Sequence, residues 1–187
     1  SDVCSSDLEL SASGAEISRR KLRDAAFVVA NLLEPPPDLE PFRAWATDAV
    51  CSEVLEHVDD PTAFLRAARA FLADGARLIV TVPGGPMSAF DRHIGHRQHF
   101  TRRKLASVLD AAGFAVNRVY CAGFPFFNLY RGVVIARGEK LASDVEAGDE
   151  SLSPAAKLAM RVFGFLFQFN LTDSQFGWQL VAVAHKA

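Results

Sequence analysis

The residues best suited to chemistry are two carboxylates and two imidazoles. Glu53, Glu56 and His57 form a Glu-x-x-Glu-His segment, and His96 stands in a later loop that is rich in His and Arg. Two oxygen and two nitrogen donors suit Mn²⁺, Zn²⁺ or Fe²⁺ better than Mg²⁺, so these four residues are candidate metal ligands. His57 and His96 are also candidate general bases. A third interpretation is structural, with His57 fixing its loop through hydrogen bonds, and the residues alone leave all three open.

Strands and helices that alternate along the chain must position these residues. Asp60 and Pro61 suit the N-cap and the first residue of a helix that ends at Gly75. Thr101 suits the N-cap of a later helix that Gly113 closes. The expected strands are 27–30, 48–51, 78–82, 114–121 and 178–184, and a first helix is expected at 13–22. This alternation indicates an α/β fold with a parallel sheet and helices on both of its faces.

Residues 122–177 are too many for a loop in a compact domain, so they are expected to hold structure of their own. Apolar spacing indicates helices within 126–134 and 158–169, separated by a polar, flexible turn at 143–153. This insert is rich in Phe. It could line a pocket for a hydrophobic or lipid-linked molecule, contact a membrane surface as an amphipathic helix, or only pack on the sheet.

The composition limits the class of protein. Half of the 187 residues are hydrophobic and the formal net charge is −2. This length forms one domain or slightly more, and the charge gives no reason to expect DNA binding. Three cysteines without a Cys-x-x-Cys pair favour a reducing, cytoplasmic location over a disulfide framework or a zinc cluster.

The order and spacing of several segments resemble class I S-adenosylmethionine (SAM)-dependent methyltransferases. The segments are Asp48 to Pro61, Gly75, Thr81-Val82-Pro83, His99-Phe100-Thr101 and Ala112-Gly113-Phe114. The resemblance implies a Rossmann-like, doubly wound sheet of seven strands with an antiparallel last strand. It also implies that the strands 114–121 and 178–184 pair with each other and that the helical insert precedes the last strand. The cofactor SAM is then expected at the carboxyl ends of the strands.

The resemblance also implies which residues bind SAM. Glu9 matches the acidic residue that binds the ribose hydroxyls, a role that suits a carboxylate because it accepts two hydrogen bonds at once. Asn31 and Leu32 match the adenine-contacting position. The loop beside the methionine part of the cofactor is matched by Cys51, Ser52 and Glu53.

One part of the family pattern has no counterpart before Glu9, namely the glycine-rich loop that cradles the methionine and ribose. Without the strand before that loop, the second and fourth strands lack their central neighbour, which exposes backbone groups and apolar surface. The expected organisation is a non-native leader at 1–8, a partial core at 9–121, a substrate lid at 122–177 and a final strand at 178–187. The sequence therefore predicts no SAM binding that calorimetry can measure for the chain as written, and micromolar binding would contradict this. The alternative to an enzyme is a non-catalytic, methyltransferase-like interaction domain.

The Glu-x-x-Glu-His segment with a distant His is similar to that of small-RNA 3′-terminal 2′-O-methyltransferases, which use a divalent metal. A related segment occurs in ubiquinone-biosynthesis O-methyltransferases. The similarity implies methyl transfer to a hydroxyl group of a small or lipid-linked molecule, with Glu53, His57 and His96 as catalytic residues. A metal held by these residues and Glu56 would lower the pKa of the acceptor hydroxyl.

Overall fold

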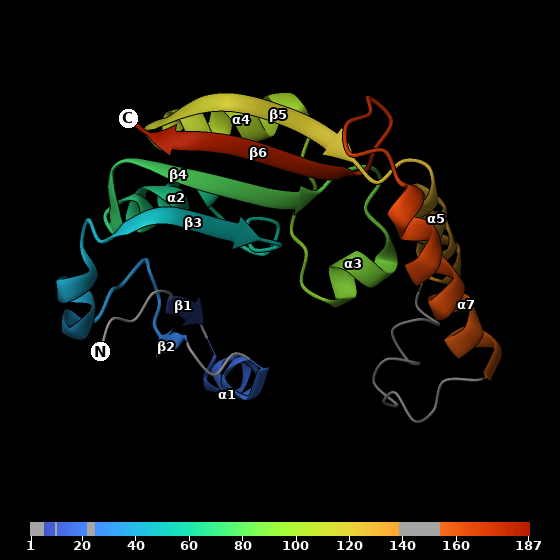
Figure 1. Ribbon diagram of the computed structural model, residues 1–187, viewed down its shortest axis with the longest axis horizontal. Helices are drawn as coiled ribbons and strands as arrows, with labels where there is room; N and C mark the ends of the chain where they lie inside the picture. Colours follow the sequence, from blue (N-terminus) through green and yellow to red (C-terminus); the bar gives the residue numbers. More distant parts are fainter. Residues whose placement is uncertain (1–5, 10, 22–24, 139–153) are drawn as a thin grey trace.

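The computed structural model describes residues 6–9, 11–21, 25–138 and 154–187. Its centre is a four-stranded sheet in the order β3–β4–β6–β5 (Figure 1). These strands are β3 (Ala46–Ser52), β4 (Leu72–Pro83), β6 (Gln179–Lys186) and β5 (Phe114–Ala122). β3 and β4 are parallel, whereas β6 runs antiparallel to both β4 and β5. The expected α/β sheet with an antiparallel last strand is confirmed.

Two amphipathic helices pack against one face of this sheet, α2 (Pro61–Arg69) and α4 (Arg102–Ala111). Both begin where the sequence predicts, because the Asp60 and Thr101 side chains accept hydrogen bonds from backbone N–H groups of the first turn. The core between helices and sheet includes Leu65, Leu105, Leu109, Val80, Val82, Ala182 and Ala184. Burial of one such Leu side chain contributes about 2 kcal/mol. The opposite face of β4 is less covered, since Ile79 and Thr81 are only half-buried.

The boundary between α2 and β4 differs from the expectation. The helix ends at Arg69 instead of continuing to Gly75, and β4 is already extended from Leu72. Gly75, at φ +72°, therefore lies inside the strand. The pairing of β3 with β4 shifts register between Ala46 and Asp48, and this shift accommodates the extra residues around Gly75. A glycine that looked like a helix end thus marks a strand irregularity.

The N-terminal part forms a separate two-stranded parallel sheet of β1 (Ser6–Glu9) and β2 (Ala26–Val29). The helix α1 (Ala12–Lys21) connects the two strands, and the 3-10 helix η1 (Pro37–Phe42) leads into β3. β1 ends at Glu9, the residue that the resemblance matches to the ribose-binding position, although no strand was expected from the pattern of the leader at 1–8. In the described residues β1 does not pair with β3. Val50 on β3 is accordingly 70% exposed.

The connection between β5 and β6 holds the two expected helices, α5 (Phe126–Arg137) and α7 (Pro154–Leu166), followed by η3 (Phe167–Phe169). Tyr130 of α5 packs edge-on against Phe163 and Phe167, with ring centroids 5.5 and 5.7 Å apart. The predicted turn at 143–153 lies outside the described residues. No helix in the described part of the chain has the length and apolarity to cross a membrane.

Candidate active site

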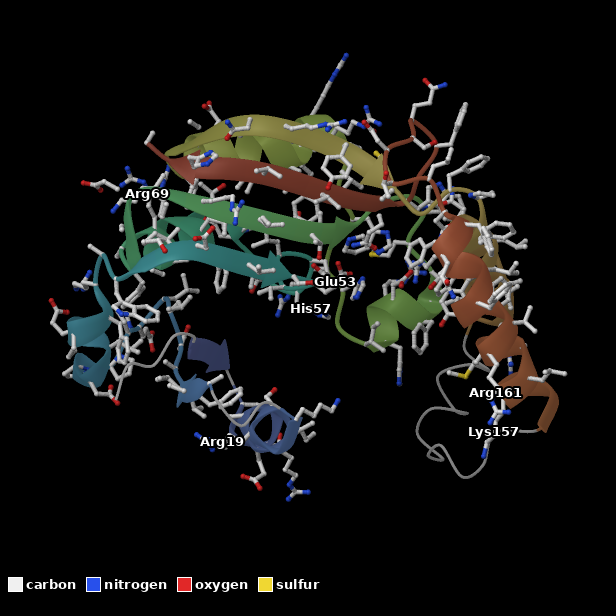
Figure 2. All side chains as sticks on the ribbon, viewed as in Figure 1. Arg19, Glu53, His57, Arg69, Lys157 and Arg161 are labelled. Atoms are coloured by element: carbon white, nitrogen blue, oxygen red, sulfur yellow. The ribbon has the colours of Figure 1, made fainter. Side chains whose placement is uncertain are left out.

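The carboxyl end of β3 places Glu53 among the ends of β4 and β6 (Figure 2). Glu53 has φ +54°, and its backbone N–H donates to the Thr81 carbonyl at 3.0 Å. Its carboxylate accepts hydrogen bonds from the Thr81 hydroxyl at 2.9 Å and from Gln179 Nε2 at 2.7 Å. Because the Thr81 hydroxyl donates to Glu53, the Ser52 hydroxyl donates to Thr81, at 2.8 Å. Polar contacts thus hold Glu53 at the edge of the sheet.

Glu56 lies in the turn after Glu53, where His57 N–H donates to the Val54 carbonyl at 3.0 Å. Its side chain is fully buried, and in the described residues neither carboxylate oxygen has a hydrogen-bond partner. A buried polar group without a partner is costly, and a catalytic role or a bound ion is one explanation for it. Burial, with the charge of Glu53 adding to it, raises the pKa of Glu56 to about 7.

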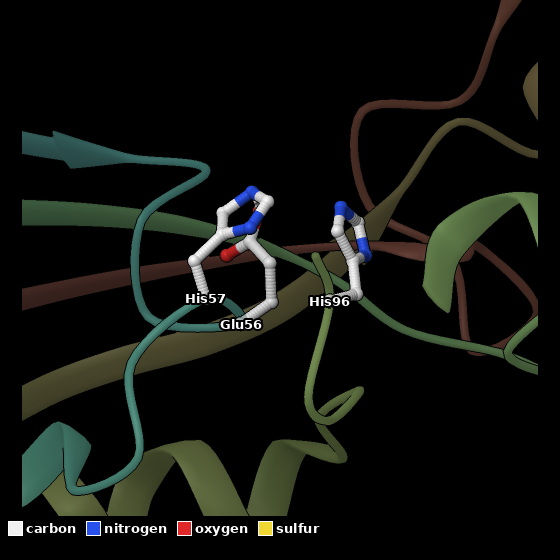
Figure 3. A group of neighbouring side chains, drawn as sticks. All are labelled: Glu56, His57 and His96. Atoms are coloured by element: carbon white, nitrogen blue, oxygen red, sulfur yellow. Dashed lines mark ion pairs between the residues drawn. The ribbon is translucent and has the colours of Figure 1, made fainter. Parts of the chain in front are cut away.

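His57 and His96 lie beside Glu56 (Figure 3). His57 Nε2 is 3.9 Å from Glu56 Oε1, and the two imidazole rings are nearly perpendicular with centroids 4.7 Å apart. One donor atom from each of the three residues lies within 4.8 Å of the other two. Burial and the neighbouring His57 lower the pKa of His96 to about 4, so His96 is neutral at pH 7. We call Glu56, His57 and His96 the donor cluster.

Arg97 joins the two chain segments that carry the donor cluster. Its backbone N–H donates to the Glu56 carbonyl at 2.8 Å, and its Nε donates to the His57 carbonyl at 2.8 Å. Its guanidinium also pairs with Asp59. In the sequence, Arg97 is only one of several basic residues in the loop that carries His96. Its contacts show that it positions His96 beside Glu56.

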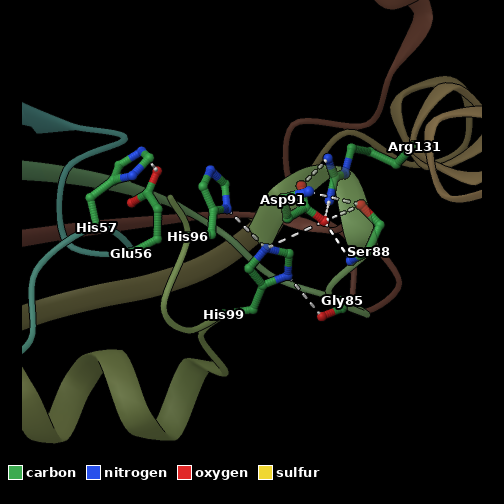
Figure 4. A network of polar contacts seen from close by, with 8 residues as sticks. All are labelled: Glu56, His57, Gly85, Ser88, Asp91, His96, His99 and Arg131. Carbon is green, nitrogen blue, oxygen red and sulfur yellow. Dashed lines mark hydrogen bonds and ion pairs between the residues drawn. The ribbon is translucent and has the colours of Figure 1, made fainter. Parts of the chain in front are cut away.

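A second polar network continues from His96 toward α5 (Figure 4). His96 Nδ1 is 3.2 Å from His99 Nε2, and His99 Nδ1 is 3.2 Å from the Gly85 carbonyl. Asp91 lies in the short helix α3 (Ala89–His93), within the His- and Arg-rich segment that was expected to be a loop. Arg131 of α5 donates two hydrogen bonds to the Asp91 carboxylate, at 2.9 and 2.8 Å.

Asp91 is fully buried and remains charged. Burial alone would raise its pKa, but hydrogen bonds from Arg131 and from Ser88 outweigh burial and hold the pKa well below its usual range. The Ser88 backbone N–H and hydroxyl each donate to Asp91 at 2.7 Å, which forms a capping box. The Ser88-x-x-Asp91 spacing was the sequence signal for α3. Arg131 carried no local signal, because it lies 40 residues away.

The donor cluster and this network open into one cavity of about 340 Å³. Its lining residues are Glu53, Glu56, His57, Pro83, Asp91, Ile94, His96, Phe127, Tyr130, Arg131 and Gln179. The structure therefore brings together all four candidate metal ligands of the sequence analysis. Glu53 lines the cavity but lies outside the donor cluster. The aromatic wall, Phe127 and Tyr130, comes from α5.

The candidate cofactor residues are spread over two sheets. Cys51 and Ser52 end β3 and Glu53 follows it, whereas Glu9 ends β1 and the Asn31–Leu32 pair follows β2. β1 and β3 run in the same direction, so these residues stand at corresponding strand ends (Figure 1). Only Glu53 lines the cavity. Burial, reinforced by the charges of Glu56 and Glu53, raises the pKa of Cys51 to about 12, so Cys51 is a thiol and no nucleophile. Roles of the other residues toward SAM stay predictions.

Comparison with known proteins identifies a family. The family model described as a methyltransferase domain matches residues 11–119. No curated protein matches the chain.

Solved structures share the fold. A SAM-dependent methyltransferase from Thermotoga maritima is 17% identical with a TM-score of 0.61, and the match covers 98% of this chain and 73% of that one. Geranyl diphosphate C-methyltransferase from Streptomyces coelicolor, in complex with Mg²⁺, geranyl diphosphate and S-adenosyl-L-homocysteine, is 15% identical (TM-score 0.54, coverage 97% and 62%). A didemethyltoxoflavin N1-methyltransferase from Burkholderia thailandensis is 16% identical (TM-score 0.52, coverage 97% and 60%). Carbon and nitrogen methylation thus occur on one fold, so the fold does not fix the acceptor atom.

Proposed function

The chain belongs to the methyltransferase domain family, and we propose that it transfers the methyl group of SAM to a hydroxyl of a small or lipid-linked acceptor. The acceptor would lie in the cavity between the end of β3 and α5, next to the donor cluster. SAM, the cofactor of this family, supplies an electrophilic methyl group when bound. The residues of the cavity orient the acceptor and take up its proton.

The buried, unpartnered carboxylate of Glu56 is the observation that carries this proposal. A group with a pKa of about 7 is suited to accept a proton at neutral pH, and the neutral His96 beside it has the same capacity. As the acceptor oxygen forms its bond to the methyl carbon, its proton passes to the donor cluster. The sulfur keeps the electron pair of the broken carbon–sulfur bond, which gives S-adenosylhomocysteine.

The donor cluster also fits a divalent cation. One carboxylate and two imidazoles suit Mn²⁺, Zn²⁺ or Fe²⁺, and a cation there would satisfy the unpartnered oxygens of Glu56. With a cation in place, Glu56 and His96 would be ligands and would not take up the proton; the cation would instead lower the pKa of the acceptor hydroxyl, and the proton would be lost to water. Glu53 is engaged by Thr81 and Gln179, so we assign it to hold the edge of the cavity instead of the cation.

The apolar wall of the cavity supports a hydrophobic part in the acceptor. Phe127 and Tyr130 of α5 and Ile94 line it. The guanidinium of Arg131 lies at the same wall. The net charge of −2 and this apolar lining support a small molecule over DNA.

We further propose peripheral contact with a membrane through α7. Leu158, Val162 and Phe165 are 62%, 48% and 60% exposed, and their i, i+4, i+7 spacing puts them on one side of the helix. Lys157 and Arg161 stand one turn apart on the same helix (Figure 2), where they can meet lipid headgroups. A membrane contact would bring a lipid-linked acceptor to the cavity.

Release of S-adenosylhomocysteine, measured by mass spectrometry, tests the proposed reaction. The chain is incubated with millimolar SAM, to populate a weak complex, with Mn²⁺, and with a prenylated phenol or a nucleotide sugar as acceptor. We expect acceptor-dependent product and a loss of about 10²–10⁴-fold in Glu56→Gln. Glu16→Gln, an exposed change on α1, is the matched control. Absence of acceptor-dependent product, or equal rates in Glu56→Gln and wild type, would contradict the proposal and favour a non-catalytic interaction domain.

A further inference from the structure

We infer that His99 is a positioning residue that fixes which nitrogen of His96 carries the ring proton. The inference rests on the proposed role of His96 in the donor cluster. His99 itself does not belong to that cluster, and it reaches His96 from the loop that follows α3.

The Gly85 carbonyl can only accept a hydrogen bond. His99 Nδ1 is 3.2 Å from this oxygen, so His99 Nδ1 carries the proton. In a neutral imidazole the other nitrogen then has a free electron pair and accepts. His96 Nδ1 lies 3.2 Å from His99 Nε2 and must donate to it. His96 Nε2 is left as an acceptor, with its electron pair available to the donor cluster.

The Gly85 carbonyl is held in place by its surroundings. Gly85 has φ +70°, and a Cβ atom there would lie 2.7 Å from the Trp178 ring. Only glycine fits both the conformation and the contact. The His99 side chain is 6% exposed, so water has little access to compete for its nitrogens. The starting point of the hydrogen-bond chain is therefore fixed by packing.

Asp91 is the group that could reverse this arrangement, because its Oδ2 lies 3.9 Å from His99 Nε2 and would favour a proton there. Its carboxylate is occupied by two hydrogen bonds from Arg131 and two from Ser88. The guanidinium also offsets the negative charge of Asp91. His99 Nε2 is thus left free to accept from His96.

The consequence for the donor cluster is direct. With the proton on Nδ1, His96 Nε2 can accept a proton from an acceptor or bind a cation. With the proton on Nε2, it could do neither. A second residue that sets the tautomer of a ligating imidazole commonly affects metal affinity by 10–100-fold. We expect the same range of effect for His99.

Histidine ¹⁵N NMR at pH 7.5 without added metal tests the inference. The chain has five histidines, so single His→Gln variants assign their signals. We expect His96 to be protonated at Nδ1 in the wild type and to shift toward Nε2 protonation in His99→Phe. His99→Gln keeps a side-chain oxygen near the position of Nε2, so this variant should retain the wild-type tautomer. Mn²⁺ affinity should fall about 10–100-fold in His99→Phe and recover in His99→Gln.

A wild-type His96 protonated at Nε2 would overturn the inference. A folded His99→Phe variant that keeps His96 protonated at Nδ1 would also overturn it. So would a folded His99→Gln variant in which His96 is protonated at Nε2. The tautomer is read without SAM or acceptor, so its failure is separable from failure of the proposed reaction. An Nδ1-protonated His96 in a chain that releases no S-adenosylhomocysteine would support the positioning role and contradict only the reaction.

Discussion

Asp91 of α3 and Arg131 of α5 form a buried, two-point ion pair, with guanidinium to carboxylate distances of 2.9 and 2.8 Å. Their side chains are 0% and 12% exposed. The pair joins the loop that carries His96 and His99 to the helix that provides the aromatic wall of the cavity. Through this contact the insert and the donor cluster are parts of one site.

Removing one partner of this pair should be costly. Arg131→Met leaves the Asp91 charge buried without compensation, and we expect a loss of about 3–5 kcal/mol in unfolding free energy. Arg118→Met, which breaks the exposed pair with Asp173, is the matched control and should cost less than about 1 kcal/mol. Urea unfolding measures both. Equal losses in the two variants would show that the buried pair does not hold α5 to α3.

The raised pKa of Glu56 predicts a pH-dependent stability. The ordinary value is 4.5 and the folded value is about 7, so the folded state binds the proton more tightly. The wild type therefore loses stability as the pH rises from 4.5 through 7. Glu56→Gln cannot ionise and avoids this loss, so its stability relative to the wild type should rise by about 2–3 kcal/mol between pH 4.5 and 8. Urea unfolding without metal at both pH values checks this, and a pH-independent difference would refute it.

SAM binding should be weak. The predicted ribose and adenine contacts, Glu9 and Asn31, stand on the β1–β2 sheet, which is not hydrogen-bonded to the sheet that carries Cys51 and Ser52. Ordering the two sheets around one ligand costs conformational entropy that a preformed site would not lose. Isothermal calorimetry should detect no micromolar binding of SAM. A micromolar dissociation constant would show that the two sheets are already arranged for the ligand.

The exposed stripe of α7, formed by Leu158, Val162 and Phe165, predicts binding to lipid vesicles. Leu158→Asp combined with Phe165→Asp should abolish cosedimentation with phosphatidylcholine–phosphatidylglycerol vesicles, because charged side chains oppose insertion of the helix face. Ala159→Asp places a charge on the same helix outside the stripe and should bind like the wild type. A wild-type chain that stays in the supernatant would exclude the membrane contact.

Local sequence signals predicted the donor cluster because Glu56 and His57 adjoin a recognisable strand end, and His96 follows in the next loop. Asp60 and Thr101 also predicted the starts of their helices, since an N-cap side chain bonds to the backbone within one turn. Residues that depend on distant partners escaped prediction. The role of Arg131 depends on its hydrogen bonds to Asp91. The role of His99 depends on the carbonyl of Gly85 and the ring of His96. The prediction that Gly75 ends a helix was wrong because glycine at positive φ is found both at helix ends and at strand irregularities.

Calorimetric titration of Mn²⁺ into the chain at pH 7.5 tests the central claim, that Glu56, His57 and His96 form a functional donor site. We expect one saturable site in the wild type, lost in Glu56→Gln and His96→Phe, and retained in Glu53→Gln because Glu53 lies outside the donor cluster. Zn²⁺ should compete for the same site. Absence of a binding heat for either ion, or binding that survives Glu56→Gln, would contradict the account.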